Sequence, residues 1–123
     1  MQKTFLILGC LSAFIGVALG AFGAHGLREK VSTEMLTVFE TGVRYQMYHA
    51  FGLIAVAWIC AQWPQSNAAV SGWFFLGGTI FFSGSLYLMT FAGARWLGAV
   101  TPIGGLLFLA GWLWLAWSVW RET

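Results

Sequence analysis

Charged side chains are scarce in this sequence. The 123 residues include only six Lys or Arg and four Asp or Glu, whereas 59% are hydrophobic. A soluble domain of this length carries about 31 charges at the usual fraction of one quarter. A small fold leaves much of its surface exposed, so it has too little interior to hide this many apolar side chains. The composition excludes a soluble monomer and predicts an integral membrane protein.

Other features are missing too, and each absence excludes a class of protein. The formal net charge is only +2, which provides no basic field for nucleic acid. The sequence has no GxSxG, P-loop or dinucleotide motif. Its two histidines lack the CxxCH, HxxxH or ExxH spacing of haem and metal sites. We therefore expect a protein that is not an enzyme and that holds no cofactor and no metal.

Four apolar runs are long enough to cross a membrane. The hydrocarbon core is about 30 Å thick and needs roughly 20 apolar residues in a helix. No segment shows the polar–apolar alternation of a membrane barrel. The predicted spans are residues 4–24, 44–63, 70–91 and 96–120. Because the connections are short, we expect one all-α domain over residues 1–123, an integral membrane four-transmembrane-helix bundle.

The segment before the second span has a different pattern. Ser32 or Thr33 can cap a helix in which apolar and polar positions alternate. The apolar positions are Met35, Leu36, Val38 and Phe39, and the polar ones are Glu34, Thr37, Glu40 and Thr41. This pattern predicts a short amphipathic helix at the membrane interface that leads directly into the second span.

The basic residues predict an orientation. We call the membrane face that holds the amino terminus side A, and four spans return the carboxyl terminus to it. Lys3 and Arg121 then lie on side A, and the remaining cations lie on side B: Arg28, Lys30, Arg95 and, at the boundary, Arg44. The positive-inside rule places side B in the cytoplasm and both termini outside it.

Aromatic residues and cysteines also divide between the two membrane halves. Seven tryptophans map to the side A half, and we expect them to anchor the protein in the headgroup region: Trp58, Trp63, Trp73, Trp112, Trp114, Trp117 and Trp120. Cys10 and Cys60 share that half. We expect buried free thiols there, and a disulfide is the alternative if side A is oxidising.

Glycine is abundant, with 16 residues, and most must lie inside the spans. Gly16, Gly20 and Gly23 recur at three- and four-residue spacing in the first span and include a GxxxG pair. Small residues let membrane helices approach closely. We expect helix packing at these three and at Gly84, Gly104 and Gly105. Packing inside one bundle and packing between copies both remain open.

Most ionisable and aromatic polar residues gather near side B. If the second span ends near Trp63, the four spans place these side chains in one layer: His25, Glu40, Arg44, Tyr45, Tyr48, His49, Tyr87 and Thr101. One interpretation is structural, with Glu40 neutralising Arg44. A second is a proton-coupled or lipid-headgroup site formed by Glu40, Arg44 and His49. A third is haem or metal ligation by His25 and His49.

Four ordered motifs carry a family resemblance over essentially the whole chain. They are GAFGAHGL from residue 20, FETGVRYQMYHA from residue 39, SGSLYL from residue 83 and GAVTPIGG from residue 98. Together they resemble the YgdD/YwdK family of small bacterial inner-membrane proteins of unknown function. The resemblance implies a four-helix inner-membrane protein without an established activity, catalytic residue or cofactor.

Three functional hypotheses follow. The first is a non-enzymatic structural, accessory or interaction component of the membrane. The second is a small oligomeric transporter or channel for a proton, a lipid or a lipophilic compound, which uses the polar layer. The third is a redox subunit that binds haem or quinone. The expected partners are membrane lipids, a second copy of the chain or another membrane protein, and not nucleic acid.

Overall fold

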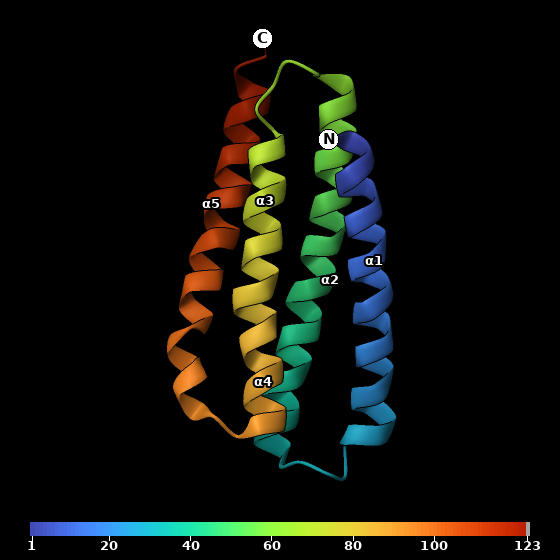
Figure 1. The fold of residues 1–123 in the computed structure, drawn as a ribbon, viewed down its shortest axis with the longest axis vertical. Helices are drawn as coiled ribbons and strands as arrows, with labels where there is room; N and C mark the ends of the chain where they lie inside the picture. The colour runs from blue at the N-terminus through green and yellow to red at the C-terminus, as the bar shows by residue number, and fades with distance from the viewer. Residues whose placement is uncertain (123) are drawn as a thin grey trace.

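In the computed structural model, which describes residues 1–122, every regular element is a helix (Figure 1). The first segment is α1 (Gln2–Phe22), extended by the π-helical turn η1 (Gly23–Leu27), and the second is α2 (Thr33–Gln62). The third comprises α3 (Ala69–Gly78), the π-helical turn η2 (Thr79–Ser83) and α4 (Gly84–Ala92). The fourth comprises the 3₁₀ helix η3 (Arg95–Ala99) and α5 (Thr101–Trp120). Both termini lie at one end, which is side A.

Three segments have the length and apolar composition of a membrane span. They are Gln2–Leu27, Ala69–Ala92 and Arg95–Trp120, and they correspond to the predicted spans 4–24, 70–91 and 96–120. The predicted span 44–63 is not among them. That stretch is the later part of α2, where Gln46 and His49 lower the hydropathy of an otherwise apolar helix.

The predicted amphipathic helix is not a separate element. Its residues form the first turns of α2, which runs for 30 residues without interruption. Ser32 is the N-cap, and its Oγ accepts a hydrogen bond from the Met35 backbone N–H at 3.1 Å. Phe39 is fully buried, whereas Glu34 and Glu40 are exposed. The apolar face of this region therefore packs inward as part of a longer helix.

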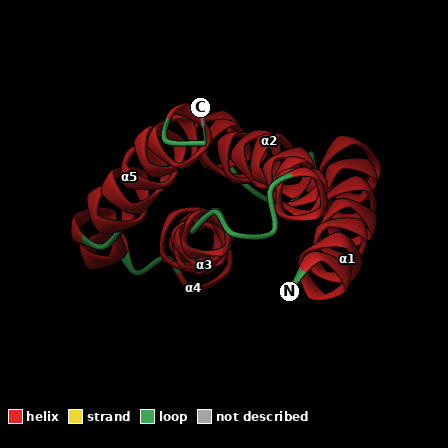
Figure 2. Ribbon diagram, turned by 90° about the horizontal axis from the view of Figure 1, so that it is seen from above, coloured by secondary structure: helices red, strands yellow, loops and turns green. Residues whose placement is uncertain are grey.

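The helix α2 lies at the centre of the arrangement (Figure 2). It packs against α1 on one side and against α3, η2 and α4 on another, whereas α5 packs mainly against α3 and η2. The core contains Phe5 of α1, Leu53 of α2, Phe75 of α3 and Phe108 of α5. Because α5 touches α2 only slightly, a groove is left between these two helices.

Large apolar side chains cover the outside of the helices. Phe14 of α1 is 73% exposed, and Leu106 and Leu113 of α5 are 67% and 74% exposed. A soluble monomer rarely exposes large contiguous apolar patches. Such an outer surface is suited to contact with lipid.

The predicted packing glycines of α1 and η1 lie against α2 of the same chain. A methyl group at Gly23 would lie 2.8 Å from the Phe39 ring, and one at Gly16 would collide with Met47. Gly20 is less tightly packed, with Val43 at 3.4 Å. The α1 surface predicted from the glycine spacing therefore faces a neighbour within the bundle.

The remaining predicted packing glycines differ from one another. A methyl group at Gly104 of α5 would overlap the Phe82 backbone in η2, whereas one at Gly105 would meet only the Phe82 ring, at 3.9 Å. At Gly84 the nearest atom is the Thr79 carbonyl oxygen of the same segment, at 4.0 Å. Among the described residues no atom of another helix lies within 4 Å of a methyl group added at Gly84, so a packing role there stays a prediction.

The cysteine prediction needs one correction. Cys10 and Cys60 are free thiols, and no disulfide joins them. Cys60 is half-buried, but Cys10 is exposed. It lies one residue after the buried Gly9 and therefore points away from the α2 contact.

Candidate functional site

His49 is the best-defined polar group inside the structure. It is only 4% exposed on α2, and its Nδ1 lies 2.7 Å from the Tyr45 carbonyl oxygen. The Trp112 Nε1–H of α5 donates to His49 Nε2 at 3.0 Å. An indole nitrogen can only donate, so Nε2 is the acceptor and Nδ1 carries the hydrogen that Tyr45 accepts. The ring stacks on Phe108 with centroids 3.5 Å apart, so its polar and apolar surfaces are both occupied.

Gln46 joins three helices. Its side-chain Nε2 donates to the Ser12 carbonyl oxygen of α1 at 2.9 Å. The Tyr87 hydroxyl of α4 donates to Gln46 Oε1 at 2.6 Å. Gln46 is 4% exposed, and both ends of its amide have a partner. A single side chain of α2 therefore binds the helices on either side of it.

Two serines continue this polar interior toward side B. The Ser83 hydroxyl at the end of η2 donates to the Gly42 carbonyl oxygen of α2 at 2.6 Å. The hydroxyl groups of Ser85 and Thr101 lie 2.6 Å apart and join α4 to α5. We call Gln46, His49, Ser83, Ser85, Tyr87, Thr101 and Trp112 the interior polar network.

The predicted polar layer divides into three groups. His49, Tyr87 and Thr101 belong to the interior polar network. Tyr45 and Tyr48 lie beside it but are exposed, and their rings are 5.5 Å apart. The other predicted site residues are exposed and make no side-chain hydrogen bond or ion pair to any residue of the described range: His25, Glu40 and Arg44.

The structure does not bring the two histidines together. His25 lies in η1, and this turn packs against Phe39 through Gly23. His49 is ten residues further along α2 than Phe39, which is about 15 Å of helix. His49 Nε2 is also occupied by Trp112. Within residues 1–122 no group of three metal-ligating side chains is present, and the geometry gives no support to haem or metal ligation by this pair.

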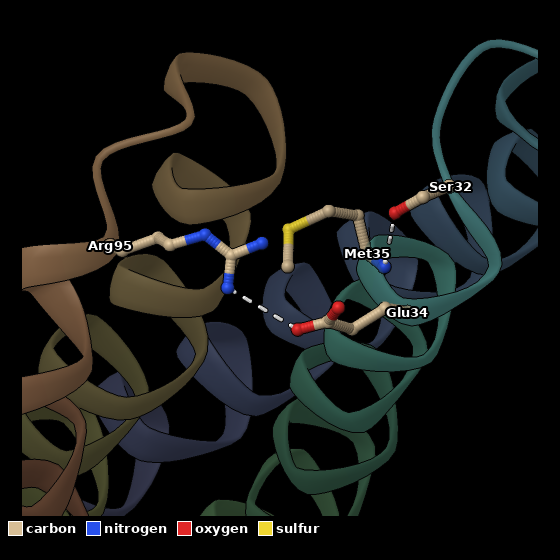
Figure 3. A network of polar contacts seen from close by, with 4 residues as sticks. All are labelled: Ser32, Glu34, Met35 and Arg95. Carbon is tan, nitrogen blue, oxygen red and sulfur yellow. Dashed lines mark hydrogen bonds and ion pairs between the residues drawn. The ribbon is translucent and has the colours of Figure 1, made fainter.

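The predicted pairing of Glu40 with Arg44 is absent. The one ion pair among the described residues joins Arg95 to Glu34, with Nη1 and Oε1 3.3 Å apart (Figure 3). It connects the start of η3 to the first turn of α2, next to the Ser32 cap and Met35. Both side chains are more than 60% exposed, so this pair adds under about 1 kcal/mol to stability.

An open groove of about 730 Å³ separates α2 from α5. Its lining combines the exposed tyrosines with one face of α5: Tyr45, Tyr48, His49, Phe82, Pro102, Gly105, Leu106, Phe108, Leu109 and Trp112. The wall is almost entirely apolar, because the polar atoms of His49 and Trp112 bond to each other. The groove has the size of a small-molecule site, for which about 300 to 1,000 Å³ is typical.

Two central members of the interior polar network, Gln46 and Trp112, were not predicted as site residues. Gln46 lies between Tyr45 and Tyr48 in a polar and aromatic stretch, and its signal is its helical spacing, four residues after Gly42 and three before His49. Trp112 was expected to be an interface anchor on side A, but its indole N–H bonds to His49 in the interior. Nothing local in the sequence distinguishes Trp112 from the other tryptophans of α5.

Comparisons with known proteins agree with the resemblance noted in the sequence. A family model described as a protein of unknown function, DUF423, matches residues 19–105. A UPF0382 membrane protein of Staphylococcus haemolyticus is 49% identical over 120 residues, 98% of each chain. The UPF0382 membrane protein YwdK of Bacillus subtilis is 43% identical over 113 residues, which are 91% of this chain and 92% of YwdK. No solved structure matches. The chain therefore belongs to the DUF423 family of membrane proteins, whose function is unknown.

Proposed function

We propose that this protein is a non-enzymatic four-helix component of a bacterial inner membrane, with a structural or accessory role. The interior polar network supports this proposal, since its side chains bond helix to helix. Gln46 bonds to α1 and α4, His49 bonds to α5, and Ser85 bonds to Thr101. Groups with these partners stabilise one helix arrangement and are not free to act on a substrate.

The proposal includes α2 as a fourth span. The residues that lower its hydropathy, Gln46 and His49, are buried and hydrogen-bonded inside the bundle. The neighbours of α2 on both sides are candidate spans. At 30 residues, α2 is about 45 Å long and exceeds the hydrocarbon core of about 30 Å. Its first turns, with Glu34 and Glu40, then project from the membrane on side B.

The close approach of α1 to α2 at two glycines supports the proposed four-helix bundle. Gly16 and Gly20 form a GxxxG pair on the α1 face that contacts Met47 and Val43 of α2. In lipid, such contacts replace the hydrophobic drive that assembles helices in water. We assign this face to packing within one chain. The outer faces remain for contact with lipid, with a second copy or with another membrane protein.

The proposed orientation places both termini in the periplasm. Side B carries most of the basic residues, namely Arg28, Lys30, Arg95 and, at the boundary, Arg44. Reporter fusions at the carboxyl terminus and in the loop between η1 and α2 test it. We expect periplasmic activity from the first and cytoplasmic activity from the second. If both reporters are active on the same side of the membrane, the four-span topology is contradicted. If the carboxyl-terminal reporter is cytoplasmic and the loop reporter is periplasmic, only the orientation is contradicted.

Purification in native nanodiscs followed by mass spectrometry tests the accessory role. We expect a protein with bound lipid or a co-purifying membrane protein, and a visible absorption spectrum without haem bands. A haem band or extracted quinone would instead favour the redox hypothesis. A stoichiometric soluble metabolite in the same preparation would argue against a purely accessory role.

A transporter of lipid or a lipophilic compound is the second candidate, and the groove between α2 and α5 favours it. The groove places His49, Tyr45 and Tyr48 beside an apolar path. Four helices are few for a pore in one chain, so this function needs an oligomer. Reconstitution into vesicles with a fluorescent lipid tests it: movement between leaflets faster than in empty vesicles supports transport, and equal rates exclude it for that lipid.

A further inference from the structure

The groove between α2 and α5 has the dimensions of one membrane leaflet. Its α5 wall contains Pro102, Gly105, Leu106 and Leu109, which recur at helical spacing along one face, and it ends at Trp112. Trp112 follows Pro102 by ten positions, which correspond to about 15 Å of helix. The hydrocarbon core is about 30 Å thick. The groove therefore runs from the side B boundary to about the bilayer centre.

The deep end of the groove suits hydrocarbon. His49 stacks on Phe108, and both of its ring nitrogens are occupied by Tyr45 and Trp112. Gly105 leaves space, because the atom nearest to an added methyl group there lies 3.9 Å away. A polar ligand would find few free partners at this depth, whereas an acyl chain needs none.

The side B end of the groove suits an anion. Arg44 is exposed on α2, and within residues 1–122 it has no acidic partner. Tyr48 lines the groove one turn after Arg44, on the same face of the helix. Helical side chains lean toward the helix N-terminus, and long cationic side chains extend toward the headgroups. Arg44 directly precedes the lining residue Tyr45, and from these tendencies we expect its side chain to extend toward side B. Glu40, one turn further out, does not pair with it.

We infer that this groove binds one anionic phospholipid of the side B leaflet, with an acyl chain along α5 as far as Trp112 and the phosphate at Arg44. The charge of Arg44 and the leaflet-length apolar wall match the two parts of such a lipid. Tyr45 and Tyr48 lie between these parts, at the depth where aromatic side chains favour the interface. This inference holds for either an accessory role or a transport role.

Native mass spectrometry in mild detergent tests the headgroup. The probes are phosphatidylglycerol and phosphatidylcholine with identical acyl chains. We expect the wild-type protein to retain phosphatidylglycerol preferentially and Arg44→Gln to reduce this preference about fivefold, the effect of one basic residue near an anionic membrane surface. Arg121→Gln removes a cation at side A and should leave the preference unchanged. Equal retention of both lipids by the wild type, or equal loss in both variants, would overturn the assignment of the phosphate to Arg44.

Filling the groove tests the position of the acyl chain. Gly105→Leu should displace the bound lipid, whereas Gly98→Leu, at an exposed glycine with no atom within 4 Å of an added methyl group, should not. A photoactivatable phosphatidylglycerol on the wild-type protein gives a second measurement that does not depend on the folding of a variant. Crosslinks should concentrate in residues 102–112 and 45–49. Crosslinks spread evenly over the outer faces, or a dimer that carries no lipid, would overturn the inference.

Discussion

At the scale of single residues, a few polar side chains determine how the helices pair. Gln46 bonds to Ser12 and Tyr87, and His49 bonds to Trp112. Hydrocarbon offers no alternative partner to these groups, so leaving one unpaired is costly. Measured hydrogen bonds between membrane helices are nevertheless modest, averaging about 0.6 kcal/mol with a maximum near 1.7. Each bond thus favours one pairing of helices more than it adds total stability.

A double-mutant cycle on Gln46 and Tyr87 tests the bond between α2 and α4. We expect Gln46→Leu and Tyr87→Phe to show a coupling of about 1 kcal/mol in the free energy of unfolding. Tyr48→Phe is the matched control, since the Tyr48 hydroxyl makes no hydrogen bond within residues 1–122. Unfolding in mild detergent is measured for the two single variants, for the double variant that combines them and for the control. Strictly additive effects would mean that the 2.6 Å contact adds nothing.

Trp112→Phe tests the bond between α2 and α5. The change keeps an aromatic ring but leaves His49 Nε2 without a donor, so we expect a loss of about 1 to 2 kcal/mol in stability. Trp117→Phe alters an exposed tryptophan on the same helix and should change stability far less. Thermal unfolding of both variants measures the difference. Equal melting temperatures would contradict the role assigned to Trp112.

At the scale of elements, the π-helical turn η2 changes the register of the third segment. Ser83, at its end, reaches Gly42 of α2, whereas Ser85 reaches Thr101 of α5. A π-helical turn inserts one extra residue into a helix and rotates the residues that follow. Gly104 of α5 lies directly against the η2 backbone at Phe82. The irregular turn and the glycine opposite it therefore form one packing unit.

Gly104→Ala tests this unit. An added methyl group would overlap the backbone of Phe82, which cannot move aside as a flexible side chain can. We expect a loss of about 1 to 3 kcal/mol, as is typical of overpacked interiors. Gly98→Ala, with open space around its Cα, is the control. If both variants unfold at the wild-type temperature, the contact between α5 and η2 is looser than described.

At the scale of the whole molecule, the distribution of side chains is that of a protein surrounded by lipid. Apolar residues such as Phe14 and Leu113 face outward, and polar residues such as Gln46 face inward. Most charged side chains gather at side B, where Glu34 pairs with Arg95. The hydrophobic effect places the molecule in the bilayer, while contacts at small residues and hydrogen bonds arrange the helices inside it.

Phe14→Arg tests whether the outer face of α1 contacts lipid. Phe14 is 73% exposed near the middle of the span Gln2–Leu27. Arginine at a span centre costs about 3 kcal/mol on insertion scales, so we expect a clear loss of membrane-inserted protein. Thr37→Arg, on an exposed position of α2 outside the proposed hydrocarbon region, should insert normally. Quantifying membrane-bound protein for both variants checks this, and equal insertion would argue against a lipid contact at Phe14.

The limits of the third and fourth predicted spans followed closely from hydropathy. The predictions 70–91 and 96–120 differ by one residue at most from Ala69–Ala92 and Arg95–Trp120. Whether α2 spans the membrane was harder to predict from hydropathy. The polar residues that lower its hydropathy are buried by other helices. The structure also divides the predicted polar layer into buried and exposed residues. Depth along a helix groups His25 with His49, but depth alone does not say which side chains face inward.

Hydropathy and charge depend only on the order of residues. The sequence by itself therefore determined that the protein is helical and embedded in lipid, and that most of its charged residues lie at side B. The pairing of polar groups could not be read in this way. The partners of Gln46 and His49 on other helices lie 34 to 63 positions away along the chain, and each of these bonds depends on how the helices rotate about their own axes. The same rotations open the groove between α2 and α5 and place Tyr45 and Tyr48 in its lining. These features arise from packing, because the interaction between helices determines which face of each one is buried.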